Sequence, residues 1–138
     1  MSGTMTNGVV ALSIPAKAEY LTVCRLALAG LTQVHAVEPE ILADVKLALT
    51  EACSNSIRHA YREGRDGDVE ILYDLGAGQI AVEVRDVGAG FPAEDETPTT
   101  DGLDEGGLGL EIIRALSDEV EIESNPGGSR LRFVKYLS

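Results

Sequence analysis

The sequence predicts an α+β fold, a two-layer sandwich in which helices cover one face of a mixed, mostly antiparallel sheet. Three observations support this prediction. Apolar residues recur at helical spacing in two early segments, 20–31 and 41–57. Two strand-like runs, 69–75 and 79–84, then flank the Gly-Ala-Gly sequence at 76–78, which is typical of a hairpin turn. Finally, a chain of 138 residues is long enough to bury the core of one such domain.

The first half of the chain predicts one strand and two helices. We expect a strand over residues 8–14 and a first helix that begins near Pro15. A second helix should begin near Pro39, because proline suits the first helical turn and the flanking acidic residues suit the positive end of the helix dipole. Its apolar periodicity continues to about Tyr61.

The second half predicts a hairpin, a loop, a helix and a further pair of strands. After the hairpin, residues 91–105 are rich in Pro, Thr, Asp and Glu and contain no Lys or Arg, so we expect a mobile loop. A short helix should span residues 108–116. Strands over 120–123 and 130–136 are expected around the turn at 125–128. The resulting order, (β)ααββαββ, is the basis of the predicted sandwich.

Composition restricts the class of partner and the cellular compartment. The chain has 23 Asp and Glu against 11 Lys and Arg, a formal net charge of −12, which argues against nucleic-acid or anionic-membrane surfaces. No apolar run approaches the ~20 residues of a membrane span, and residues 1–7 lack a secretory pattern. Cys24 and Cys53 fall in helical patterns, which favours reduced thiols. We expect a single cytoplasmic domain over residues 1–138, with 1–7 disordered.

Two glycine-containing stretches indicate phosphate binding. The first is Asp-Val-Gly-Ala-Gly at 86–90, and the second is Gly-Gly-Leu-Gly-Leu at 106–110. Glycine lets the backbone approach a ligand closely, and the second stretch opens a predicted helix, whose N-terminal amides favour an anion. The carboxylate of Asp86 is suited to accept hydrogen bonds from an amine such as that of a purine. Neither stretch follows the P-loop or dinucleotide-binding pattern.

The second predicted helix carries a polar stripe. Glu51, Asn55 and His59 recur every four residues and therefore share one face. Glu51 and Asn55 are ~6 Å apart along the helix axis, so a carboxylate that activates a hydroxyl and an amide that holds a hard cation fit side by side. Polar stripes are more often solvated faces, but the poor helix-forming run at 51–56 favours a functional one. His59 either faces the ligand or bonds a neighbouring carbonyl.

Taken together, these motifs resemble the N, G1 and G2 boxes of the GHKL ATPase superfamily, which has a histidine-kinase-like (Bergerat) ATP-binding fold. The closer resemblance is to the stand-alone anti-sigma factor serine kinases of bacteria. It is carried by LTEACSNSIRHAY at 49–61, VRDVGAGF at 84–91, GGLGL at 106–110, DEV at 118–120 and GGS at 127–129. The order and spacing of these motifs make the resemblance specific, and it covers the chain from about Ile14 to the C-terminus.

The resemblance implies an ATP site between the helix with the polar stripe and a lid over residues 92–106. Glu51 is implied as the general base for a protein Ser or Thr hydroxyl, Asn55 as a ligand of Mg²⁺, and Asp86 as the partner of the adenine amine. Ser129 is implied to support hydrogen bonding on the adenine side. The positions implied or considered for ATP and ADP binding are Asn55, His59, Asp86, Gly88, Gly90, Gly107, Leu108, Gly109 and Ser129.

The resemblance also implies partners. Members of the family sequester a sigma factor and phosphorylate a small anti-anti-sigma protein of the STAS type, and they are commonly homodimers. Arg25 matches an arginine that the family uses for partner contact, although an exposed, solvated arginine fits the sequence equally well.

The chain departs from the family at Glu105, where relatives often carry a basic residue. Two alternatives therefore stay open: a nucleotide-binding module that binds partners without phosphotransfer, and a detached histidine-kinase catalytic domain, which is disfavoured by the lack of an upstream phosphoacceptor hairpin.

Overall fold

The computed structural model describes residues 9–35, 37–62, 67–76, 78–87, 108–125 and 128–137. It contains the predicted elements in the predicted order. These are β1 (Val9–Pro15), a 3-10 turn (Ala18–Tyr20), α1 (Leu21–Val34), α2 (Pro39–Arg62), β2 (Asp68–Gly76), β3 (Gln79–Val87), α4 (Leu108–Leu116), β4 (Glu119–Asn125) and β5 (Gly128–Tyr136). The predicted disordered segment at 1–7 and the predicted lid at 92–106 lie outside the described residues.

Most element boundaries agree with the prediction to within two residues, but two differ by three residues, and both of these differences come from strand pairing. The first helix was expected near Pro15, but helical structure begins only at Ala18, because the amide of Ala16 bonds the carbonyl of Gly67 at 3.0 Å and keeps the chain extended. Strand β3 was expected to end at residue 84, but it continues to Val87 because its last residues pair with the start of β5. Asp86 therefore lies inside a strand rather than after it.

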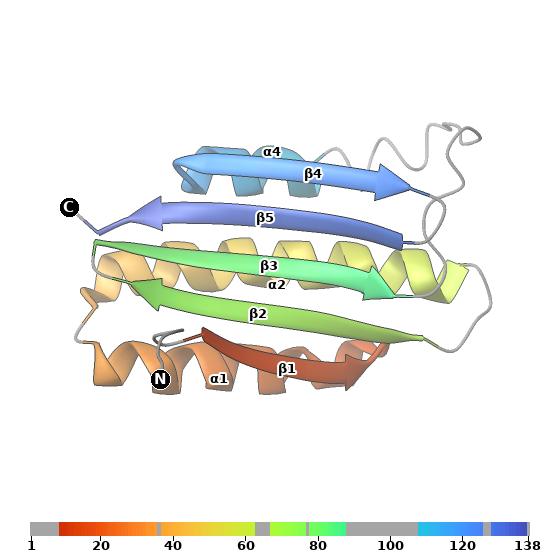
Figure 1. The fold of residues 1–138 in the computed structure, drawn as a ribbon, viewed down its shortest axis with the longest axis horizontal. Coiled ribbons are helices and arrows are strands. Elements are labelled where there is room, and N and C mark those ends of the chain that lie inside the picture. Colours follow the sequence, from red (N-terminus) through yellow and green to blue (C-terminus); the bar gives the residue numbers. More distant parts are fainter. Residues whose placement is uncertain are drawn as a thin grey trace, which may run out of the picture.

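The five strands form one sheet in the order β1-β2-β3-β5-β4, and each neighbouring pair among them is antiparallel. Helices α1, α2 and α4 lie behind the same face of this sheet (Figure 1). Helix α1 packs near β2, α2 crosses behind the centre of the sheet, and α4 lies behind β4. The α+β sandwich predicted from the sequence is confirmed.

The core fills the space between the sheet and the helices. Strand β2 alternates buried and more exposed residues, as expected for a strand with one covered face. Its buried side chains are Val69, Ile71, Tyr73 and Leu75. Tyr73 is fully buried, and its hydroxyl donates a hydrogen bond to the carbonyl oxygen of Cys24 at 2.9 Å, which satisfies the polar end of an otherwise apolar side chain. Burial of this apolar face is what holds helices and sheet together.

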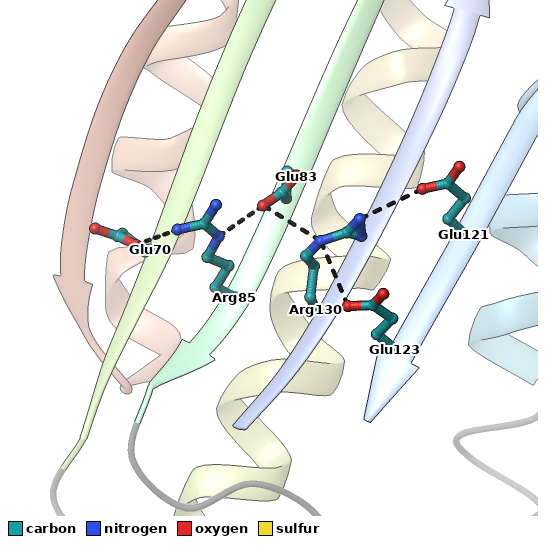
Figure 2. Close-up of polar contacts among 6 residues, drawn as sticks. All are labelled: Glu70, Glu83, Arg85, Glu121, Glu123 and Arg130. Atoms are coloured by element: carbon teal, nitrogen blue, oxygen red, sulfur yellow. Dashed lines mark hydrogen bonds and ion pairs between the residues drawn. The ribbon is translucent and has the colours of Figure 1, made fainter. Parts of the chain in front are cut away.

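The opposite face of the sheet is charged (Figure 2). Ion pairs and hydrogen bonds run across neighbouring strands, and they link Glu70, Glu83, Arg85, Glu121, Glu123 and Arg130. The shortest joins Arg85 Nε to Glu83 Oε2 at 2.6 Å, and Arg130 reaches the same carboxylate at 3.6 Å. Ion pairs that are partly exposed to solvent add little stability, so their main effect is to keep this face polar. Among the described residues, no helix is both long and apolar enough to cross a membrane.

Candidate functional site

Glu51 and Asn55 lie side by side on α2, as their spacing predicted, and the start of α4 closes over them. Gly109 marks the contact. A Cβ built on Gly109 would lie 3.2 Å from Oε1 of Glu51 and 3.6 Å from Nδ2 of Asn55. An added Cβ would crowd Oε1 of Glu51 and make ordinary contact with Asn55, and glycine avoids this crowding. The structure thus brings Gly109 of the second glycine stretch against the polar stripe, although Gly109 lies 54 residues after Asn55 in the chain.

Asn55 also has a partner that the sequence analysis did not single out. The guanidinium of Arg58 donates a hydrogen bond from Nη2 to Oδ1 of Asn55 at 2.8 Å. Arg58 is exposed, whereas Glu51 and Asn55 are half-buried. The bond follows from the three-residue spacing, which brings two side chains onto neighbouring turns of a helix. That spacing was visible in the sequence, and it places a positive charge directly beside the polar stripe.

Asp86 forms a second part of the site, at the end of β3. It is 2% exposed, which is unusual for a carboxylate, and it lies on the strand opposite Ser129 of β5. The backbone there is tightly packed: Gly128 has φ +154°, and a Cβ on it would lie 2.5 Å from the carbonyl oxygen of Asp86. Only glycine fits such an approach without a shift of the chain. Asp86 and Ser129 are thus brought together as neighbours in one sheet.

The two parts lie toward the same end of the molecule. Figure 1 shows the C-terminal half of α2, the end of β3, the start of β5 and the start of α4 on the same side of the view. Leu108 is the first residue of α4, so its amide lies at the N-terminus of a helix, where backbone N–H groups favour an anion. The remaining predicted positions are less defined: the backbone of His59 lies in α2, whereas Gly88, Gly90 and Gly107 lie outside the described residues.

Arg25 lies apart from these groups. It is half-buried on α1, close enough to Cys24 and Cys53 to influence both thiols electrostatically. Helix α2 separates α1 from α4, so Arg25 and Gly109 lie on opposite flanks of α2 (Figure 1). The structure therefore distinguishes a polar site on the α4 side of α2 from a separate surface on α1.

The donor groups fit a nucleotide with its metal. A carboxamide oxygen next to a carboxylate is a hard oxygen set of the kind that Mg²⁺ prefers, and magnesium sites commonly use few protein ligands together with phosphates. A buried carboxylate accepts hydrogen bonds from an exocyclic amine. Gly109 leaves the backbone without a side chain beside Glu51 and Asn55, and Gly128 does the same beside Asp86. Chemically, this arrangement suits a purine nucleotide at one end and its phosphates at the other.

Comparison with known proteins agrees with this geometry. Residues 14–135 match the histidine kinase-like ATPase domain family. Three similar proteins are serine-protein kinases RsbW. The one from Bacillus pumilus (strain SAFR-032) is 37% identical and is matched over 96% of this chain and 88% of its own length. The one from Bacillus subtilis (strain 168) is 34% identical over 94% and 86%. That from Staphylococcus aureus is 32% identical over 93% and 86%.

Solved structures show the same fold. The structure of the RsbU and RsbW domains of Rv1364c from Mycobacterium tuberculosis matches with a TM-score of 0.71 and 19% identity, over 94% of this chain and 32% of that chain. The present chain thus spans about a third of that longer protein. The SiaB-SiaC complex from Pseudomonas aeruginosa gives a TM-score of 0.67 with 16% identity, over 91% of this chain and 88% of that chain.

Proposed function

The chain belongs to the histidine kinase-like ATPase domain family, and we propose that it is an ATP-dependent protein serine/threonine kinase. Its relatives named serine-protein kinase RsbW are 31–37% identical over most of both chains. The observation that carries the proposal is the close approach of Gly109 to Glu51 and Asn55, which leaves so little room that a Cβ on Gly109 would lie 3.2 Å from the carboxylate and 3.6 Å from the carboxamide. Phosphoryl transfer depends mainly on such positioning of phosphates, metal and base.

Glu51 is the proposed general base. Its carboxylate accepts the proton of a serine or threonine hydroxyl on the protein substrate while that oxygen bonds the γ-phosphorus of ATP. The bond from the γ-phosphorus to the bridging oxygen breaks, and ADP leaves with the bonding electrons. Glu51 is half-buried next to Asn55, so the base stands beside the group that would hold the metal. Mg²⁺, held by Asn55, would neutralise charge on the phosphates.

Arg58 is the proposed source of positive charge at the phosphates. By the family resemblance, the acidic Glu105 stands at a position of a basic residue, so we expect the charge of the γ-phosphate to need an offset from elsewhere in the chain. The guanidinium of Arg58 lies within hydrogen-bond distance of Asn55, at 2.8 Å. When the Asn55 oxygen binds the metal, the guanidinium would exchange this hydrogen bond for one to a phosphate oxygen, a charge-assisted interaction.

Asp86 is proposed to recognise adenine. Its carboxylate accepts hydrogen bonds from the adenine amine, and Ser129 on the neighbouring strand supports this side of the site. Gly88 and Gly90 are proposed to let the chain turn beneath the nucleotide. The amides of Gly107, Leu108 and Gly109 are proposed to hold phosphates, with His59 near them.

The proposed partners are a sigma factor, which the protein sequesters, and an anti-anti-sigma protein of the STAS type, which it phosphorylates. Exposed apolar side chains on α1 support partner binding next to Arg25. Val23 is 40% exposed and Leu26 is 65% exposed, on either side of this arginine in the sequence. We further propose that the protein is a cytoplasmic homodimer. The exposed Val9 and Val10 on edge strand β1 offer an apolar surface for the second copy.

The test of the kinase is transfer of labelled phosphate from ATP to a purified STAS-type protein, with partners first identified by pull-down in ATP and in ADP. Transfer by the wild-type chain that is lost in Glu51→Ala, with nucleotide binding retained, supports the kinase. The alternative is a module that binds nucleotide and partners without transfer, which the acidic Glu105 favours. Nucleotide-dependent capture of a partner without any labelled product would establish that alternative.

A further inference from the structure

Two arginines lie directly opposite each other on β3 and β5, next to the pair that forms the proposed adenine side of the site. Arg85 and Arg130 are cross-strand partners, and Asp86 and Ser129 are the next pair of the same ladder. Successive side chains of a strand point to opposite faces, so the arginines lie on the charged face while the buried Asp86 points toward the helices. Like charges that are directly opposite in a sheet destabilise strand pairing. This repulsion therefore acts one residue away from Asp86.

Glu83 lies between the two arginines and contacts both (Figure 2). Its Oε2 lies 2.6 Å from Nε of Arg85 and 3.6 Å from Nε of Arg130. Within the described part of the chain, it is the one carboxylate at ion-pair distance from both guanidinium groups. Its side chain is only 14% exposed, so solvent screens these two contacts less than the outer ones. The hydrogen bond to Glu83 also raises the pKa of Arg85.

The other carboxylates drawn in Figure 2 lie on the far sides of the two arginines. Glu70 of β2 is 3.6 Å from Nη1 of Arg85. On the other side, Arg130 lies 3.4 Å from Glu121 and 4.0 Å from Glu123, both on β4. Strands β2 and β4 flank the β3–β5 pair on opposite sides, so these carboxylates attract the two arginines away from each other. Only the carboxylate between them opposes this separation.

The backbone next to the arginines has little room for a shift. Val87 and Gly128 form the last pair of the β3–β5 ladder, and a Cβ on Gly128 would lie 2.5 Å from the carbonyl oxygen of Asp86. Strands separate most easily at the end of a ladder, because neighbouring pairs support them on one side only. A force that separates the two arginines therefore displaces Asp86 from Ser129.

We propose that Glu83 is a positioning residue, whose carboxylate holds the end of β3 against the start of β5 and thereby directs Asp86 at the adenine amine. The inference rests on the proposed function, because it assumes that Asp86 binds adenine. Glu83 lies on the other face of the sheet and touches no nucleotide, so it acts through Asp86 alone. Its loss should therefore change the selectivity for the base and leave the binding of the phosphates unchanged.

The test compares calorimetric affinities for ADP and for inosine diphosphate, in which an oxygen replaces the exocyclic amine of adenine. The wild-type chain should bind ADP at least about tenfold more tightly, because Asp86 accepts a hydrogen bond from the amine. Glu83→Gln keeps the shape of the side chain and removes its charge. It should reduce the preference for ADP by about threefold, through weaker ADP binding with unchanged binding of inosine diphosphate. Hydrogen exchange of the amides of residues 84–87 should accelerate in the same variant.

A second substitution tests whether charge is the cause. Arg85→Gln in the Glu83→Gln background removes one of the two repelling charges, so it should restore the preference for ADP and the slow exchange. A merely structural loss would not be rescued by the removal of another side chain. The matched control is Glu70→Gln, which changes the net charge equally and removes a contact of Arg85 but leaves its link to Arg130. This control should keep the wild-type preference.

The outcomes separate this inference from the proposed function. A wild-type preference for ADP that survives Glu83→Gln would overturn the inference alone. An equal loss of affinity for both nucleotides, or a double variant without rescue, would do the same, because either result would show a general loss of structure. A wild-type chain that binds both nucleotides equally would refute the adenine role of Asp86, and with it this inference. Retained binding of inosine diphosphate in Glu83→Gln shows that the variant is folded.

Discussion

The guanidinium of Arg58 donates a hydrogen bond to Oδ1 of Asn55 at 2.8 Å, one turn along α2. The same oxygen is the one proposed to bind Mg²⁺. The two interactions would oppose each other, because a cation on Oδ1 would lie beside the positively charged guanidinium. Metal binding at this oxygen would therefore involve a change of partner for Arg58, and this relationship makes the charge balance of the site testable.

Replacement of Arg58 by Gln should weaken phosphotransfer about 10- to 100-fold, because a charged donor at the phosphates is lost while a polar side chain of similar length remains. Arg58→Lys, which keeps the charge, should retain most of the activity. Transfer rates at saturating ATP and calorimetric ATP affinity measure the effect. If Arg58→Gln transfers phosphate at the wild-type rate, Arg58 does not offset the phosphate charge.

Glu51→Gln should lower the rate of transfer about 10²- to 10⁴-fold with little change in nucleotide affinity, because the amide has nearly the shape of the carboxylate but cannot accept the proton. Glu40→Gln, a substitution in the exposed first turn of the same helix, is the matched control and should leave the rate unchanged. A single-turnover assay separates transfer from binding. A wild-type rate of transfer in Glu51→Gln would show that Glu51 is not the general base.

Asp86→Asn should weaken binding of ATP and ADP at least about tenfold, since one acceptor oxygen facing the adenine amine becomes a donor. Asp74→Asn on the exposed side of β2 serves as the control, because it changes the net charge equally without touching the site. Isothermal calorimetry with both nucleotides measures the effect. Equal affinities for Asp86→Asn and the wild-type chain would show that Asp86 does not bind adenine.

Two glycine substitutions form a matched pair. Gly109→Ala adds a Cβ 3.2 Å from Oε1 of Glu51, so we expect weaker nucleotide binding and slower transfer. Gly30→Ala lies in α1, where an added Cβ meets nothing within 4 Å, and it should raise the free energy of unfolding by about 0.5–1 kcal/mol with unchanged binding. Urea unfolding and calorimetry measure both variants. Unchanged nucleotide binding in Gly109→Ala would show that the start of α4 is not part of the nucleotide site.

Much of the fold could be predicted because its elements carry strong local signals. The bounds of α4 follow from its apolar periodicity, and the start of α2 follows from Pro39 with acidic neighbours. The end of β3 could not be predicted in this way. Its last residues, through Val87, are extended because they pair with β5, more than 40 residues later in the chain. Local propensity contains no information about such a partner.

The sequence by itself determined that Glu51 and Asn55 share a face, because helical periodicity is a local property of the backbone. It also indicated the family to which the chain belongs, and the family match over residues 14–135 confirms that family. Only the tertiary structure decided that Gly109 closes over that face and that Asp86 is buried opposite Ser129. These are contacts between distant segments, and they are settled by the packing of helices on a sheet rather than by any local pattern.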